Sequence, residues 1–230
     1  MERVVSTADR IIEASVKLFN ADGVSQVSLR GIADKIGISH GNLAYHFSNK
    51  GEILDELYKR MEQEMDDAVY PAGDLTLHHY HRMAKRISEF HDRYRFFYLD
   101  MLEITRHYPR VIRRYRRTVA LRFEQYDRLM ADLIRKGLVK REPEPGFYRS
   151  QFRSIWVMST FWLQHKAVLG KNHPVLDAGS DVRHVWEIML QHLTPKGLRE
   201  FKEICESERG RNDHYPLTGP CSAVYLKRIG

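Results

Sequence analysis

Apolar side chains recur every three or four residues along most of this 230-residue chain, which is the spacing of one face of an α-helix. The pattern predicts helices over about residues 50–68, 77–90, 97–104, 111–134, 147–169 and 181–192. Pro71-Ala72-Gly73, Gly137 and the loop 141–146 separate some of these segments and are typical chain breaks. We therefore predict an all-α protein.

Two short helices are predicted near the N-terminus, with Ser28 and Ser39 as their N-caps, because a serine hydroxyl can accept from the free N–H groups of a first turn. Gly37 lies between them, where the chain must leave the first helix in a left-handed conformation. Leu43 and Phe47 of the second helix are expected to face the core. This pattern predicts a helix-turn-helix.

The remaining side chains of the second helix should therefore face outward. Polar side chains on an exposed helix can hydrogen-bond base edges and hold phosphates in a major groove of DNA. Gly41 would let the backbone approach the DNA closely. The polar residues on this face are His40, Asn42, Tyr45 and His46.

The next helix should start with Asn49 and Glu52 as a capping-box pair. Lys50 lies in its first turn, where a cation is unfavourable for the helix dipole but useful against a phosphate. This conflict between local stability and charge indicates a function for Lys50.

The stretch from Ser28 to Lys50 resembles the helix-turn-helix of the TetR family of bacterial transcriptional regulators. Family members show IA-x3-G and then a segment close to GNLYYHF-x-x-K, which corresponds here to Ile32-Ala33, Gly37, residues 41–47 and Lys50. The likeness extends upstream through Thr7, Ile11, Ala14, Leu18, Phe19 and Gly23.

The resemblance also implies roles for individual residues. Those implied to contact phosphates are Ser28, Ser39, Tyr45, His46 and Lys50. Those implied to lie nearest the bases are His40, Gly41, Asn42 and Ala44. Ala44 departs from the family, which often has an aromatic residue there, so the sequence preference stays open.

The resemblance implies a DNA-binding domain over residues 1–50, a helical regulatory and dimerisation domain over 51–207, and an extended or disordered tail over 208–230. In a TetR-like arrangement the helices at 147–169 and 181–192 pair with a second subunit, which doubles the contacts on a palindromic operator. The interface residues expected on the last of these helices are Val182, Val185, Trp186 and Met189. For Trp186 and Met189 an internal core is the alternative.

Aromatic and methionine side chains in the helical body are of the kind that line small-molecule sites. The candidates for such a pocket are Phe97, Met101, Phe152, Trp156, Met158, Phe161 and Trp162. For each of them plain core packing is the alternative. With a pocket, the chain is expected to be a repressor released by a small, largely apolar effector; a filled body would favour a ligand-independent DNA-binding dimer controlled by a protein partner.

The net charge of +7 favours a polyanionic partner, but residues 1–50 are nearly neutral. The excess lies in an arginine-rich segment, for which three hypotheses are open: a solvated helix face, long-range attraction of DNA, and binding of an anionic effector. Its arginines are Arg106, Arg110, Arg113, Arg114, Arg116, Arg117 and Arg122.

Other function classes find little support in the sequence. No apolar run could span a bilayer and the start lacks the apolar centre of a signal peptide, so a cytoplasmic protein is expected. Cys205 and Cys221 have no CxxC spacing, and His78, His79 and His81 have no carboxylate or cysteine at a ligand spacing, so no metal is expected. Nucleotide-binding and hydrolase motifs are absent, so neither an enzyme nor a cofactor is expected.

Overall fold

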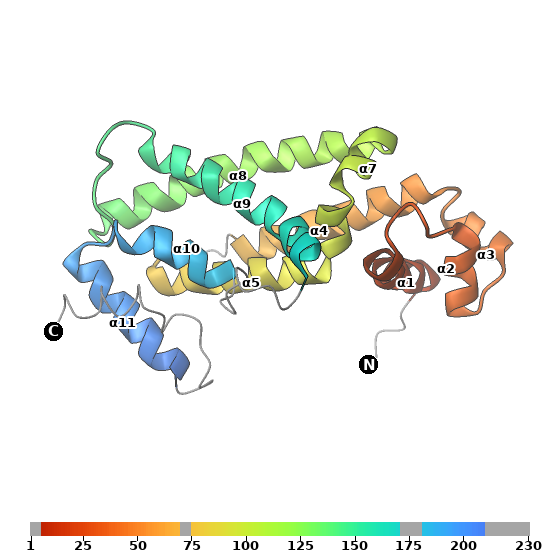
Figure 1. Ribbon diagram of the computed structural model, residues 1–230, viewed down its shortest axis with the longest axis horizontal. Helices are drawn as coiled ribbons and strands as arrows, with labels where there is room; N and C mark the ends of the chain where they lie inside the picture. The colour runs from red at the N-terminus through yellow and green to blue at the C-terminus, as the bar shows by residue number, and fades with distance from the viewer. Residues whose placement is uncertain (1–5, 70–74, 171–180, 210–230) are drawn as a thin grey trace. The chain divides into compact units, whose positions relative to one another are not determined.

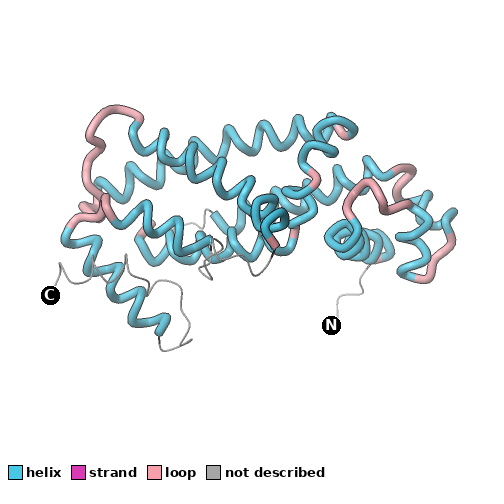
Figure 2. Tube along the Cα trace, in the orientation of Figure 1, coloured by secondary structure: helices cyan, strands magenta, loops and turns pink. Residues whose placement is uncertain are grey.

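The computed structural model describes residues 6–69, 75–170 and 181–209 of the chain (Figure 1). Within these ranges the secondary structure is helical, with one isolated antiparallel bridge between Val139 and Leu193 (Figure 2). The fold class is therefore all-α, as predicted. The helices are α1 (Thr7–Asp22), α2 (Leu29–Ile36), α3 (His40–His46), α4 (Lys50–Val69), α5 (Leu77–Arg93), α6 (Arg95–Leu99), α7 (Met101–His107), α8 (Pro109–Arg135), α9 (Phe147–Leu169), α10 (Asp181–Leu190) and α11 (Pro195–Arg209).

The chain divides into two compact units. The first consists of Met1–Asp67 and Phe90–Val119, and the second of Ala68–Glu89 and Ala120–Gly230. The predicted domain boundaries at residues 50 and 207 stay a prediction. No described helix is both long and apolar enough to cross a membrane.

Aromatic side chains fill the core of the first unit. The Phe19 ring of α1 lies 5.4 Å from that of Phe96, and Phe97 packs on Tyr58 of α4 at 5.2 Å and on Tyr115 of α8 at 5.6 Å between ring centroids. Such contacts join α1 and α4 to helices that are far away in the sequence. This packing fixes the positions of α1 and α4 within the first unit.

The core of the second unit centres on Trp186, whose side chain is fully buried. Its ring lies 5.2 Å from that of Tyr80 on α5 and 4.7 Å from that of Phe201 on α11. The indole N–H donates a hydrogen bond of 3.2 Å to Nδ1 of His81. Trp186 therefore joins three helices of this unit.

Most of the predicted helices are present, and α9 has the predicted bounds. The predicted helix at 97–104 is instead two short helices that meet at Asp100, and α10 ends at Leu190, two residues earlier than predicted. The segment 71–73 and residues 210–230 of the predicted tail lie outside the described residues. The tail was predicted to begin at residue 208, but Glu208 and Arg209 belong to α11, and Glu208 is buried.

The sequence analysis did not predict α11. The signals for it are present: Thr194 caps the helix, with its Oγ1 accepting from the Gly197 N–H at 3.1 Å, and Pro195 occupies the first helical position. Phe201 and Ile204 then form its buried side. This helix completes the packing around Trp186.

Candidate nucleic-acid interface

The first helix of the predicted helix-turn-helix, α2, is fixed at both ends. Ser28 Oγ accepts from the Gly31 N–H at 3.0 Å, and Gly37 adopts the left-handed conformation with φ 70°, so both predictions are confirmed. Arg10 of α1 donates to the carbonyl of Ile36 at 2.7 Å. The end of α2 is therefore bound to α1 as well as closed by glycine.

The second helix, α3, is short and is held by one cap and one buried side. Ser39 Oγ accepts from the Asn42 N–H at 3.1 Å, while Leu43 and Phe47 are buried. Figure 1 shows α2 and α3 side by side at the end of the chain's first unit. The structure thus confirms the helix-turn-helix and the core role of Leu43 and Phe47.

The other side of α3 is open to solvent. His40, Gly41 and Asn42 are exposed, Ala44 and His46 are half-buried, and Tyr45 is 86% exposed. A large aromatic side chain that leaves most of its surface in water gains little from folding. Its exposure indicates a surface that is available to a partner.

Lys50 is bound to the protein itself. Its ammonium donates to the carbonyls of Val24 at 2.6 Å and Ser25 at 3.3 Å, and burial lowers the pKa of Lys50 from its ordinary value. Asp100 holds the same segment from the other side, because its Oδ2 accepts from the Val24 N–H at 2.7 Å. Lys50 and Asp100 therefore position the connection that leads into α2.

The role of Asp100 was missed by the sequence analysis. It lies 76 residues after Val24, and no spacing rule relates the two positions. The same is true of Asn20, whose side chain donates to the carbonyl of Arg93 at 2.7 Å and accepts from the Phe96 N–H at 2.9 Å. These contacts attach α1 and its following loop to α6.

The start of α4 differs in one detail from the predicted capping box. Asn49 Oδ1 accepts from the Glu52 N–H at 3.1 Å, as expected. The Glu52 carboxylate, however, accepts from both the N–H and the hydroxyl of Ser48, each at 2.8 Å, and these bonds lower the pKa of Glu52. Glu52 therefore fixes the connection between α3 and α4.

The predicted pocket residues have several environments. Phe97 and Met101 are buried in the first unit, while Phe152 stacks on Tyr126 of the second at 4.0 Å between ring centroids. Trp156 is half-buried with its ring 6.1 Å from that of Phe123. These four residues have packing partners from the protein itself.

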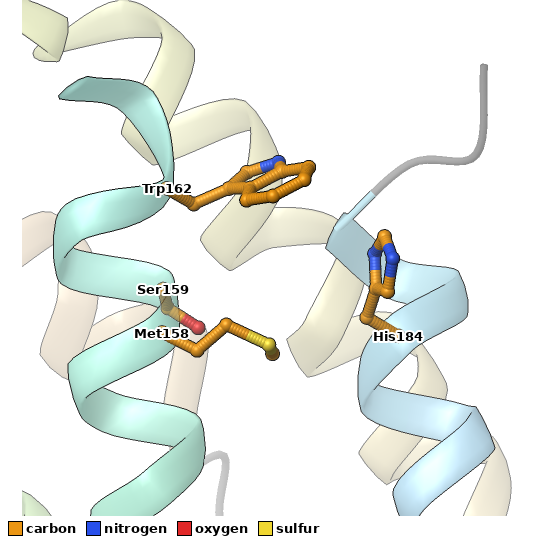
Figure 3. Close-up of a pocket in the computed structure, with 4 residues that line it drawn as sticks. All are labelled: Met158, Ser159, Trp162 and His184. Carbon is orange, nitrogen blue, oxygen red and sulfur yellow. The ribbon is translucent and has the colours of Figure 1, made fainter. Parts of the chain in front are cut away.

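Met158 and Trp162 of α9 line a small hollow with Ser159 and with His184 of α10. Figure 3 shows both side chains pointing from α9 toward the helix of His184. The ring centroids of Trp162 and His184 are 5.5 Å apart. Two of the predicted pocket residues therefore share one hollow.

Three of the four residues predicted to form a dimer interface are buried in the core of one chain instead. Val182, Trp186 and Met189 are buried within a single chain, so their side chains belong to its core. Val185 is half-buried. Exposed apolar side chains occur instead on α9, and these are Val157, Phe161 and Val168.

The histidine cluster on α5 has structural contacts. His81 is bonded to Trp186 and lies 3.6 Å from Glu208, and burial lowers the pKa of His79. No group of three potential metal ligands occurs within the described ranges.

Comparison with known proteins identifies two family matches. Residues 11–57 match the family described as bacterial regulatory proteins, tetR family, and residues 60–201 match TetR, described as a bacterial transcriptional repressor. YttP of Bacillus subtilis (strain 168), a probable HTH-type transcriptional regulator, is 42% identical over 53 residues. That match covers 23% of this chain and only 26% of YttP.

Solved structures extend the likeness beyond the N-terminal helices. A TetR-family transcriptional regulator from Marinobacter aquaeolei VT8 is 26% identical, covers 83% of this chain and 93% of its own, and superposes with a TM-score of 0.74. A complex of SmeT with triclosan shares the fold at 17% identity, with 81% of this chain and 91% of SmeT covered and a TM-score of 0.56. The two family matches together include most of the helices described above. The chain belongs to the TetR family of DNA-binding transcriptional regulators.

Proposed function

We propose that this regulator is a homodimeric repressor that binds DNA through α2 and α3 and is released by a small, largely apolar effector. The observation that supports it most is the open polar side of α3, on which Tyr45 is 86% exposed. The family description of residues 60–201 as a transcriptional repressor supports the direction of regulation.

The proposed DNA contacts follow from the placement of the side chains. Ser28 and Ser39 stand at helix N-termini, where a phosphate is favoured by the free N–H groups and the helix dipole. His40 and Asn42 are exposed in the first turn of α3, which supports a role in contacting base edges. Lys50 acts in this proposal mainly by holding the Val24–Ser25 carbonyls, with its remaining N–H available for a phosphate.

Homodimerisation is supported by an apolar stripe on α9, made by Val157, Phe161 and Val168, which are 52%, 46% and 84% exposed. Their spacing of four and seven residues places them on one side of the helix. Exposed apolar side chains in a row are typical of a contact surface. A second copy of the chain would cover this stripe and present two α3 helices to a palindromic operator.

The proposed effector site is the hollow between α9 and α10 (Figure 3). Its volume of about 20 Å³ has room for about one water molecule, so an effector would have to widen it as it binds. The Trp162 indole and the Met158 thioether offer an apolar surface, and Ser159 and His184 offer a few polar atoms, which is the usual chemistry of small-molecule sites. SmeT, which shares the fold, has been solved in a complex with triclosan. A compound that binds better to a conformer with poor DNA affinity would shift the population away from the operator.

Selection of bound duplexes from a random DNA pool would test DNA binding and supply the operator. Tyr45→Ala should then weaken binding to every duplex, whereas Asn42→Ala should change which duplexes are selected. Lys202→Ala, at an exposed position of α11, is the matched control and should bind as the wild type does. Unchanged binding in both the Tyr45 and Asn42 variants would contradict the proposed surface.

Dimerisation is tested separately by sedimentation velocity. Phe161→Glu introduces a charge into the apolar stripe and should yield monomers with an unchanged circular dichroism spectrum. Lys202→Glu introduces the same carboxylate at an exposed position outside the stripe and should stay dimeric. A dimeric Phe161→Glu variant would show that the subunits do not meet through this side of α9.

The effector site is tested by titrating small aromatic compounds into the complex of the protein with its selected duplex. At least one compound should release the DNA from the wild type, and Trp162→Ala should need a higher concentration of it. Release by a protein partner, with no response to any compound, would favour the ligand-independent alternative.

A further inference from the structure

The arginine-rich segment contains two different groups of residues. Arg114 is bound to the carboxylates of Asp55 at 3.1 Å and Glu62 at 2.9 Å, and Arg122 is buried and donates to Gln125 Oε1 at 2.7 Å. These two arginines have structural roles inside the protein. They are set apart from the five others.

The five others are exposed and form what we call the arginine stripe, defined as Arg106, Arg110, Arg113, Arg116 and Arg117. Arg106 lies near the end of α7 and the rest lie in the first turns of α8, where spacings of three and four residues place Arg110, Arg113 and Arg117 on one side. No aspartate or glutamate occurs between residues 104 and 120. The stripe is therefore strongly positive.

Almost all of this charge is unneutralised. Arg106, Arg113, Arg116 and Arg117 form no ion pair within the described part of the chain, and Arg110 reaches Asp55 only at 3.5 Å while its side chain is 72% exposed. Placing like charges at three- and four-residue spacing on a helix destabilises it. Binding a polyanion relieves the repulsion between these arginines and therefore lowers the free energy of such a cluster.

The arginine stripe lies in the same compact unit as the helix-turn-helix, and Arg110 in the first turn of α8 lies 3.5 Å from Asp55 of α4, the helix that follows α3. Hydrogen bonds from Ser48 lower the pKa of Glu52 most, and the nearby positive charge of Arg110 lowers it further. The Glu52 carboxylate accepts from the N–H of Ser48. The Tyr108 ring lies against Gly51 at the start of α4. A short chain of contacts thus links the connection between α3 and α4 to the start of α8.

We infer that the arginine stripe is a second DNA-contacting surface, which attracts and holds phosphates that flank the base pairs read by α3. This inference rests on the proposed function, because it assumes that α3 faces DNA. In this proposal the arginines contact phosphates and not base edges. Phosphates are the same in every sequence, so the arginines add affinity without adding sequence preference. Each phosphate neutralised would release counterions and steepen the dependence of binding on salt.

The test compares two duplexes with the same selected centre, one of about 20 and one of about 40 base pairs, so that only the second has flanks beyond the two half-sites. Fluorescence anisotropy gives the affinity over a range of potassium chloride concentrations. The variant is Arg113→Gln with Arg117→Gln. The matched control is Arg199→Gln with Lys202→Gln, which removes two exposed cations from α11.

The wild type should bind the longer duplex more tightly, and the arginine variant should lose about tenfold on it, with a shallower salt dependence and little change on the shorter duplex. The control should resemble the wild type. Equal affinities of variant and wild type on both duplexes would overturn the inference and leave the proposed function intact. Equal loss on both duplexes would also overturn it, because the arginines would then act on the centre. Failure of the wild type to bind either duplex would overturn both.

Discussion

His81 makes the folded second unit sensitive to acid in a way that can be calculated. Its side chain is 4% exposed, and its Nδ1 accepts from the Trp186 indole N–H at 3.2 Å, so the neutral imidazole has its proton on Nε2, which faces Glu208 at 3.6 Å. Burial lowers the pKa of His81 from 6.5 to about 4. Lys85 and His78 act in the same direction, while Glu208 opposes the shift.

The sign of the effect follows from linkage. The unfolded chain binds this proton more readily than the folded chain does, so the free energy of unfolding is highest above pH 6.5, falls as the pH drops toward 4, and levels off below that. With these two pKa values the loss between about pH 7 and pH 5 is about 2 kcal/mol. Protonation also places a second N–H against the Trp186 indole N–H, which breaks that hydrogen bond.

The assay is urea denaturation followed by circular dichroism at both pH values. His81→Asn is the informative variant, because the amide oxygen can still accept from Trp186 and the side chain does not titrate. Its stability should fall between pH 7 and pH 5 by about 2 kcal/mol less than that of the wild type. Parallel losses in the two proteins would refute the reasoning, since the titrating group would then lie elsewhere.

Three further substitutions test individual contacts. Gly197→Ala should destabilise the protein by about 1–3 kcal/mol in urea denaturation, because the added methyl would overlap the backbone carbonyl of Leu138; a stability equal to the wild type would contradict this packing. Arg114→Met should lower the melting temperature by leaving the buried carboxylate of Asp55 with weaker partners, at a cost of about 1–3 kcal/mol. Ser39→Ala should cost about 1 kcal/mol through loss of the α3 cap and weaken DNA binding in anisotropy titrations, whereas unchanged values in both would assign the cap no role.

Local chemistry accounts for the parts of the fold that were predictable. A serine cap, a left-handed glycine and two buried apolar side chains determine α2 and α3 within about twenty residues, and each of these features can be recognised without tertiary contacts. The bounds of α9 were predictable for the same reason, because glycines flank a long helical pattern.

The partners of residues were not predictable in this way. The helix position of Lys50 and the family resemblance predict a phosphate contact, whereas its nearest acceptors are carbonyls 25 and 26 residues earlier in the chain. The sequence is compatible with an interface or a core position for Trp186, and its contacts with Tyr80 and His81 of α5 and with Phe201 of α11 decide for the core. Periodicity identifies a buried side but does not identify what covers it.

The proposed DNA-contacting residues of α3 and the segment that leads into α2 are held in place by different contacts. Asn42 and Tyr45 project from a helix that is fixed by Ser39 and Leu43, so their direction is set by local structure. The segment that leads into α2 depends instead on Asp100, which lies where α6 meets α7. A shift at that junction would reach the N-terminal helices through the Asp100 bond to Val24 and the Asn20 bonds to Arg93 and Phe96, without altering any side chain that we propose to face DNA. We therefore expect the affinity for an operator to depend on the first unit as a whole and not on the helix-turn-helix alone.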